Sequence, residues 1–273
     1  MNAHTAPDPL AGFDLGPVID WLTANRAAVS KNLHWLDTDI KVRYEAIEGA
    51  EHLHLSSHEI SNALMRFPQS ARDRSVLTKI IGMPFTWFAK GTTFAKPETT
   101  QVAEEALSPR AIVPGYSAPN TWTTDLQEQW IRLYHLGQTP PDIARYMQVH
   151  ALIHEYVHTI INPMWYSLGR LYMIKMPGLV PMDARMFFAK FVLAASKYPA
   201  ISHYAAAYRP LPTSTGDPKF IERVGEELCE SVVAFILGHI YCDDPKRCLD
   251  PFMDRPDVRQ LVTDFLQAKH IPE

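Results

Sequence analysis

Residues 154–158 read His-Glu-Tyr-Val-His, and their types and spacing are suited to holding a metal ion. On a helix, His154 and His158 are four positions apart and leave the same face, so their imidazoles can reach one point. Two neutral imidazoles are a frequent part of a zinc site. Glu155 would lie beside the metal, where it can take a proton from a metal-activated water. The pattern predicts a Zn2+ cofactor and hydrolytic chemistry.

A pattern of five residues also occurs by chance, so the prediction depends on the helix that must carry it. Thr139-Pro-Pro-Asp142 is typical of a helix start, and no Gly or Pro interrupts the run from Asp142 to Ile161. Asn162-Pro163 predicts the end of this helix. The residues next to the motif are uncharged, as expected of a helix that is packed into a core. His150, one turn earlier, is interpreted as a supporting or packing residue.

A catalytic zinc site needs a third protein ligand and one open position. The helix predicted over Phe220–Tyr241 offers candidates, because Glu226 and Glu230 are four positions apart and would share a face. Facing an apolar core, such a pair requires a metal or another compensating positive charge. The alternative is an exposed acidic stripe in which Arg223 pairs with Glu227. Spacing alone does not decide between these two interpretations.

Three motifs that follow one another along the chain resemble those of the gluzincin type of zinc metallopeptidase. They are His-Glu-Tyr-Val-His, the segment Ile201-Ser-His-Tyr204 and the segment Glu226-Glu-Leu-Cys-Glu230. The chain is similar in this respect to the C-terminal protease domain of anthrax lethal factor and related bacterial peptidases, over roughly residues 140–240. The order of the three motifs is more specific than the first motif alone.

The resemblance implies a role for each motif. Glu226 would be the third zinc ligand, and Glu230 would be a carboxylate that steadies a ligand histidine. The Tyr204 hydroxyl would help to hold the oxyanion during catalysis. Two departures from the family are a longer spacing between the tyrosine and the glutamates, and Cys229 in place of a small Ala. The longer spacing leaves Glu227 as an alternative third ligand, and Tyr204 has a packed core tyrosine as its alternative role.

The expected fold class is mainly α (α+β), and the resemblance implies a zincin-like metallopeptidase domain with a small edge sheet and a helical N-terminal part. Residues 1–17 are rich in Ala, Pro, Asp and Gly and are expected to be disordered. Residues 18–105 are interpreted as a helical N-terminal region, and residues 106–273 as the zincin-like catalytic domain. Residues 108–124 predict one or two short strands, where a peptidase would keep an edge strand to pair with substrate.

Further elements are predicted from capping residues, breakers and apolar patterns. Helices are expected over residues 18–36, 57–67, 164–175 and 183–197, with a short one beginning near Arg255-Pro256-Asp257. A loop is expected over residues 209–219. Residues 75–94 are apolar and aromatic and stay unassigned between helix and strand.

Composition limits the classes of function. The 273 residues carry a net charge of −4, which gives no basic footprint for nucleic acid. No apolar run reaches the roughly 18–20 residues that span a bilayer, so no membrane span is expected. Three cysteines do not make a disulfide framework and favour free thiols in a reducing cytosol. The alternative is a Cys242–Cys248 bridge in a protein exported without a signal peptide.

The function expected from these observations is that of a zinc-dependent endopeptidase that hydrolyses peptide bonds with Glu155 as general base. Its partner would be a protein or peptide substrate. Its location would be the cytoplasm, or a host cell that it enters as a bacterial effector by a signal-peptide-independent route. The alternatives are a housekeeping cytosolic peptidase and a non-proteolytic zinc-binding or interaction protein on a zincin-like fold. The sequence does not indicate an oligomeric state.

Overall fold

The computed structural model describes residues 47–48, 53–83, 115–119, 129–136, 139–166, 171–242 and 244–272. These residues are mainly helical and contain two small sheets. The mainly α expectation is therefore confirmed for the part of the chain that the structure describes. The predictions for residues 1–17 and for a helix over residues 18–36 lie outside the described residues.

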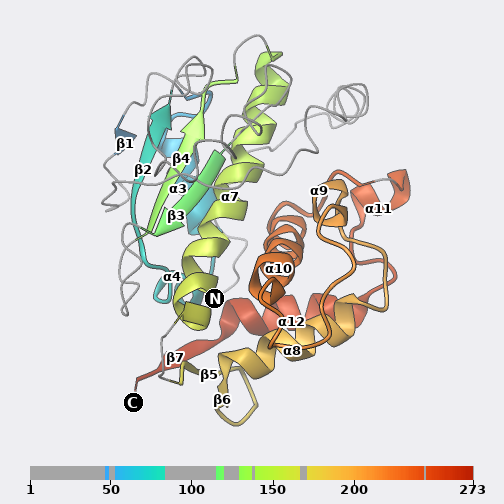
Figure 1. Ribbon diagram of the computed structural model, residues 1–273. Helices are drawn as coiled ribbons and strands as arrows, with labels where there is room; N and C mark the ends of the chain where they lie inside the picture. The colour runs from blue at the N-terminus through green and yellow to red at the C-terminus, as the bar shows by residue number, and fades with distance from the viewer. Residues whose placement is uncertain are drawn as a thin grey trace.

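The motif lies on α7, which spans Pro141–Tyr166 and packs against both the larger sheet and α10 (Phe220–Leu237). Figure 1 shows α7 running between that sheet and the C-terminal helices. The predicted end at Asn162-Pro163 is wrong, because the helix continues past Pro163. Proline has no N–H to donate to the carbonyl of Thr159. Val76 N donates to this carbonyl instead, at 3.1 Å, so the proline leaves no buried acceptor without a partner.

The larger sheet has four strands in the order β1-β2-β4-β3. They are β1 (Ile47–Glu48), β2 (Leu77–Met83), β4 (Gln129–Tyr134) and β3 (Gly115–Pro119). β2 pairs in parallel with β1 and β4, and β3 pairs antiparallel with β4. β3 confirms the prediction of a strand within residues 108–124 and stands at an edge of the described sheet. β1 and β2 precede residue 106, so the sheet joins the two predicted parts of the chain.

Two short helices, α3 (Ser57–Met65) and α4 (Gln69–Arg72), precede β2. The helix predicted over residues 57–67 is thus confirmed, but it ends at Met65. Its cap is Ser56, whose hydroxyl accepts from Glu59 N while the Glu59 carboxylate accepts from Ser56 N. α3 packs against α7 and contributes apolar side chains to the core under the motif helix.

The second sheet is antiparallel and has three short strands in the order β6-β5-β7. β5 (Met173–Lys175) pairs with β6 (Met182–Asp183) and with β7 (Lys269–Ile271). The helix predicted over residues 164–175 is therefore wrong. One of the two strands that pair with β5, β7, lies almost 100 residues away, and no local pattern reveals such a partner. The prediction over residues 183–197 is confirmed by α8 (Ala184–Ala195), which Asp183 caps.

The C-terminal part consists of α9 (His203–Ala206), α10, α11 (Pro245–Leu249) and α12 (Pro256–Gln267). The predicted end of α10 at Tyr241 is wrong. Gly238 has a φ of 78°, a left-handed conformation that closes the helix. α12 begins at Pro256, as predicted.

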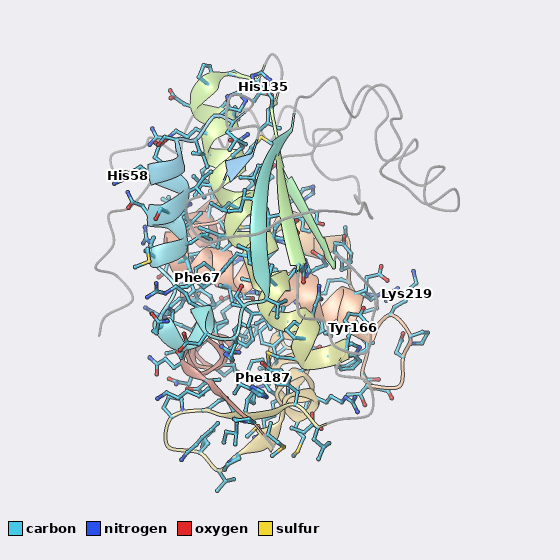
Figure 2. The ribbon with its side chains drawn as sticks, turned by 90° about the vertical axis from the view of Figure 1, so that its left-hand side faces the viewer. His58, Phe67, His135, Tyr166, Phe187 and Lys219 are labelled. Atoms are coloured by element: carbon cyan, nitrogen blue, oxygen red, sulfur yellow. The ribbon has the colours of Figure 1, made fainter. Side chains whose placement is uncertain are left out.

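One apolar core joins α7, α8, α10 and α12 to the larger sheet. Figure 2 labels two fully buried members of this core, Phe67 after α3 and Phe187 on α8, and two exposed residues, His58 and Lys219. Among the described residues, no helix combines the length and apolar character needed to cross a membrane.

Candidate metal centre and active site

α7 and α10 pack against each other and bring the predicted ligand residues together. His154 and His158 lie on α7, and Glu226 and Glu230 lie one turn apart on the side of α10 that faces them. Only 1% of the Glu230 side chain and 12% of the Glu226 side chain are exposed. The alternative of an exposed acidic stripe is therefore wrong for these residues, because the carboxylates are buried against two imidazoles.

Four atoms from three side chains converge on one small space between the helices. The Nε2 atoms of His154 and His158 are 3.2 Å apart. Glu226 places Oε2 3.0 Å from Nε2 of His154, and Oε1 3.4 Å from Nε2 of His158. Ligand atoms that are 2.0–2.1 Å from a tetrahedral zinc are separated by about 3.3 Å. The spacing of the three groups therefore fits a zinc ion.

The contacts of Glu226 also fit a metal. Its Oε2 atom is buried, and the polar atom beside it is Nε2 of His154, at 3.0 Å. Two histidines and one glutamate are, moreover, a ligand set found in catalytic zinc sites. The site thus holds a buried acceptor with spare capacity and the donor types that zinc prefers.

Glu230 supports His154 from the opposite side of the ring. Its Oε1 atom accepts from Nδ1 of His154 at 2.7 Å and from Nε2 of His150 at 2.8 Å. Because the carboxylate can only accept, Nδ1 of His154 carries a proton, and a neutral His154 ring would present the lone pair of Nε2 to the space beside His158. Metal-binding histidines typically have their second nitrogen held in this way. The interpretation of His150 as a supporting residue agrees with its contact.

The charges of the site reinforce one another. Burial alone would raise the pKa of Glu226, but His158 and His154 lower it below its ordinary value. Glu230 has a lowered pKa for the same reason, with His150 and His154 opposing its burial. Burial would lower the pKa of His154, yet the two glutamates raise it well above the usual value. Two buried carboxylates therefore attract positive charge, either protons on the histidines or a metal ion.

Glu155 follows His154 on α7 and is half-buried. Burial and Glu226 raise the pKa of Tyr204 well above its ordinary value, and the Glu155 carboxylate adds to this effect. Glu155 likewise contributes to the raised pKa of Tyr208, after burial and Glu226. The Glu155 carboxylate therefore acts electrostatically on both tyrosines.

Tyr204 reaches the site from α9, a helix that the sequence did not predict. Its ring meets the His154 ring edge-on, with centroids 5.4 Å apart and planes at 88°. The Tyr204 hydroxyl is 3.1 Å from the hydroxyl of Tyr208, one turn further along. Tyr208 was missed by sequence reasoning. The only available signal was its four-residue spacing from Tyr204, which matters only once this segment is known to be helical.

Glu227, the alternative third ligand, faces away from the two histidines. Its Oε1 atom accepts from the Arg209 guanidinium at 2.7 Å and from Ile201 N at 3.2 Å. Only 1% of its side chain is exposed. Glu227 therefore anchors the segment that carries Tyr204 to α10, and Glu226 is the glutamate that faces the imidazoles.

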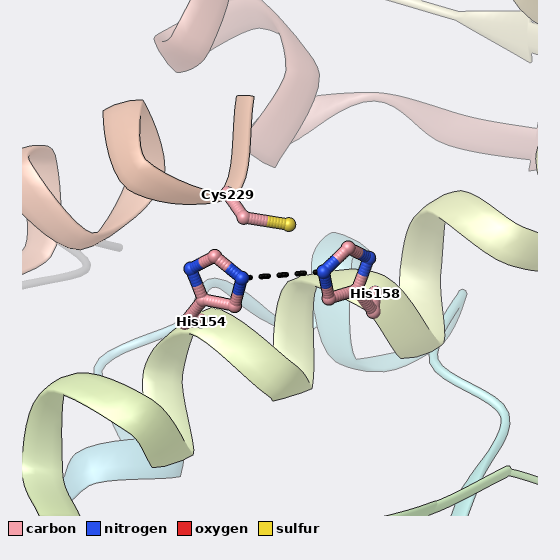
Figure 3. Close-up of side chains that lie close together, drawn as sticks. All are labelled: His154, His158 and Cys229. Carbon is pink, nitrogen blue, oxygen red and sulfur yellow. Dashed lines mark hydrogen bonds between the residues drawn. The ribbon is translucent and has the colours of Figure 1, made fainter. Parts of the chain in front are cut away.

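Cys229 lies on the same face of α10 as Glu226, and Figure 3 shows its sulfur above the two imidazoles. Its Sγ atom and one nitrogen each of His154 and His158 all lie within 4.8 Å of one another. Burial raises the pKa of the thiol well above its ordinary value, and Glu226 adds to the effect. Because a thiolate is the metal ligand, Cys229 would have to lose this proton in order to bind a metal.

The described residues contain buried groups of His, Glu and Cys side chains that are able to hold a metal, with His154 common to all of them. Comparisons of the chain with models of protein families, with curated proteins and with solved structures found no match. The functional argument therefore rests on the residues of the site and on their geometry.

Proposed function

We propose that the protein is a zinc-dependent endopeptidase of the gluzincin type. The observation that carries the proposal is the convergence of His154, His158 and Glu226 on one space, from two helices about 70 residues apart in the chain. Glu155 and Tyr204 lie around that space with the acid–base and hydrogen-bonding groups that amide hydrolysis needs.

His154, His158 and Glu226 would hold the zinc, with Glu230 keeping His154 in the required tautomer. Bound zinc would supply a Lewis acid that polarises the scissile carbonyl and acidifies a water molecule. Glu155 takes a proton from the attacking water and then delivers it to the leaving amine. The Tyr204 hydroxyl donates a hydrogen bond to the oxyanion that develops on the substrate, a contribution of about 3–4 kcal/mol for one donor.

The larger sheet supplies a place for an extended substrate. β3 is at one of the two edges of the described sheet, and it packs against α7, the helix that carries the motif. A peptide that adds to this edge would form main-chain hydrogen bonds with β3 irrespective of most side chains. We therefore propose a protein or peptide substrate that is bound in an extended conformation.

The test is peptide cleavage by the wild type and by Glu155→Gln. The amide of glutamine is nearly isosteric but cannot accept the proton, so cleavage of a peptide library should fall by at least about 100-fold. Zinc content should stay the same, because Glu155 is not among the three converging groups. A chelator should abolish wild-type cleavage, and added zinc should restore it. Full activity of Glu155→Gln would remove Glu155 from the mechanism.

A second candidate function is a non-proteolytic zinc-binding protein, and the position of Cys229 favours it. If the thiol joined His154, His158 and Glu226 as a fourth ligand, the site would be closed, as structural zinc sites are. The variant Cys229→Ala separates the two functions. If the site is catalytic, Cys229→Ala keeps its zinc and its peptidase activity. If the site is a closed structural one, Cys229→Ala binds zinc more weakly, and the wild-type protein cleaves no peptide.

A further inference from the structure

A pair of cysteines lies next to the candidate site, in the segment that follows α10. The sulfur atoms of Cys242 and Cys248 are 3.4 Å apart, and both thiols are free and buried. Cys242 N donates to Cys248 Sγ at 3.4 Å, and the Cys248 thiol approaches the carbonyl oxygen of Cys242 at 3.3 Å. Backbone contacts therefore hold the Cys248 sulfur beside Cys242.

The backbone around the pair is also held at both ends. Ile240 N donates to the carbonyl of Cys248 at 2.9 Å, and Cys248 N donates to the carbonyl of Asp244 at 3.0 Å. These bonds bring the chain back on itself, so that cysteines six residues apart are neighbours. A disulfide bond requires a sulfur separation of about 2.05 Å, and the present separation is little more than an ångström longer. A small side-chain rotation is enough to close it.

We propose that Cys242 and Cys248 are a reversible redox pair, which forms a disulfide by exchange with a low-molecular-weight disulfide such as glutathione disulfide. Neither cysteine belongs to the metal-binding groups found among the described residues, all of which contain His154. Cys229, the third cysteine, lies on α10 beside His154 and His158. The pair therefore has a chemistry separate from that of the candidate active site.

The exchange takes place in two balanced steps. Cys248 loses its thiol proton and attacks one sulfur of glutathione disulfide, which breaks the S–S bond and releases one glutathione thiolate that takes up a proton. Cys242 then loses its proton and attacks the protein–glutathione disulfide at Cys248. This step forms the Cys242–Cys248 bond and releases the second glutathione. The protein is oxidised by two electrons, and one glutathione disulfide is reduced to two glutathiones.

The environment of the pair favours Cys248 as the attacking sulfur. The hydrogen bond from the Cys242 thiol lowers the pKa of Cys248, and the backbone N–H of Cys242 lowers it further. The same contact raises the pKa of Cys242. The pair lies beside α11, where Lys246 and Leu249 are exposed, and Figure 1 shows this helix at the outer edge of the molecule. Cys248 itself is 2% exposed, so exchange at its sulfur requires a local opening of this short surface helix.

The disulfide would act on the segment that supports α9. His203 N donates to the carbonyl of Tyr241 at 3.0 Å, and the rings of the two residues are in contact. Tyr241 directly precedes Cys242, and His203 directly precedes Tyr204. A disulfide between Cys242 and Cys248 would close a loop of seven residues. It would therefore restrict the backbone next to Tyr241, which accepts the hydrogen bond from His203 at the start of α9. This consequence concerns Tyr204, whereas formation of the disulfide does not depend on the proposed function.

The experiment equilibrates the folded wild-type protein in a glutathione buffer and measures intact mass and free thiols. Oxidation should remove about 2 Da and lower the number of titratable thiols from three to one, and dithiothreitol should reverse both changes. Peptide mapping of the oxidised protein should find Cys242 joined to Cys248. Cys229→Ala is the matched control and should lose the same mass, because its pair is intact.

Cys248→Ser lacks one member of the pair, so it should form no internal disulfide and should not lose about 2 Da. Cys242→Ser lacks the thiol that displaces glutathione, so it should keep one glutathione bound to Cys248. If either serine variant fails to fold, peptide mapping of the wild type alone still decides the question. Three free thiols after equilibration in the oxidising buffer would overturn the proposal. A bridge that involves Cys229 would overturn it as well. Peptidase activity is not part of this readout, so failure of the proposed function would not affect it.

Discussion

At the scale of single residues, the two ring nitrogens of His154 have different partners. Nδ1 donates to Glu230, and Nε2 faces Glu226 and His158. The orientation of the ring is therefore set by Glu230, with Nε2 directed at Glu226 and His158. His150 shares the same Glu230 oxygen, so the carboxylate is fixed by two donors.

Replacing Glu230 with Gln should weaken zinc binding without removing a ligand. The amide keeps the shape but loses the charge that holds His154 in place, and such changes typically cost about 10–100-fold in metal affinity. Competition with a chromophoric chelator measures the effect. Glu222→Gln, in the first turn of the same helix, is the matched control and should bind zinc like the wild type. Equal affinities for the Glu230 variant and the wild type would contradict the supporting role.

The hydroxyl pair of Tyr204 and Tyr208 leads to a second prediction at this scale. If Tyr204 donates to the oxyanion, Tyr208 must be the donor in the hydrogen bond between them. Tyr204→Phe should lower kcat by about 100–1,000-fold with little change in KM, as for other single oxyanion donors. Tyr208→Phe keeps the main donor and should lower kcat by a smaller factor. Steady-state kinetics distinguish these outcomes, and a larger loss in Tyr208→Phe would reverse the assignment.

The sequence predicted part of the site and left the rest open for physical reasons. His154, Glu155 and His158 were predicted from their spacing on one helix, because the regular geometry of a helix determines the relative positions of residues with a given spacing. The choice between Glu226 and Glu227 depends on Arg209, whose guanidinium binds Glu227. Because Arg209 lies in a loop without periodicity, its partner could not be read from the chain.

At the scale of elements, the wrong predictions have their cause in distant partners. Pro163 is a helix breaker in isolation, but Val76 satisfies the carbonyl that the proline leaves without a donor. Residues 173–175 are a strand because β7 pairs with them from the C-terminal end. The ends that local chemistry determines were predicted well: Asp183 caps α8, and α12 starts at Pro256.

Asp257 ties the start of α12 to the end of α8 and gives a prediction of pH dependence. Its carboxylate accepts from Lys197 at 2.7 Å and from Tyr198 at 2.9 Å. Burial would raise the pKa of Asp257, but Lys197, Tyr198 and the backbone N–H of Val258 lower it below the ordinary 3.8. The stabilisation is therefore complete above that ordinary value and is lost as the pH falls through the lowered one.

Asp257→Asn should accordingly lower Tm at pH 7 by an amount equivalent to about 1 kcal/mol or less, because the pair is partly exposed. The difference from the wild type should narrow as the pH falls below about 4. Thermal melts at a series of pH values measure this. Asp264→Asn on the same helix is the control and should show no such dependence. A difference that persists unchanged to pH 2 would point to a cause other than the charge of Asp257.

At the scale of the whole molecule, two regions are joined by one long helix. α7 packs with one part of its surface on the larger sheet and with another on α10. The sheet itself combines β1 and β2 with β3 and β4, across the division expected near residue 106. Composition and patterns predicted a mainly helical chain. The parallel pairing of β2 with β4 has no local signature in the sequence. Of the larger sheet, the sequence therefore predicted only the strand that became β3.

The central claim is that one zinc ion is held by His154, His158 and Glu226. It is tested most directly by metal analysis of the protein purified without chelator, as wild type, Glu226→Ala and Cys229→Ala. The wild type and Cys229→Ala should each contain about one zinc per chain, and Glu226→Ala should contain much less. A wild type without bound metal would contradict the claim, and so would a Glu226→Ala protein that keeps its zinc while Cys229→Ala loses it.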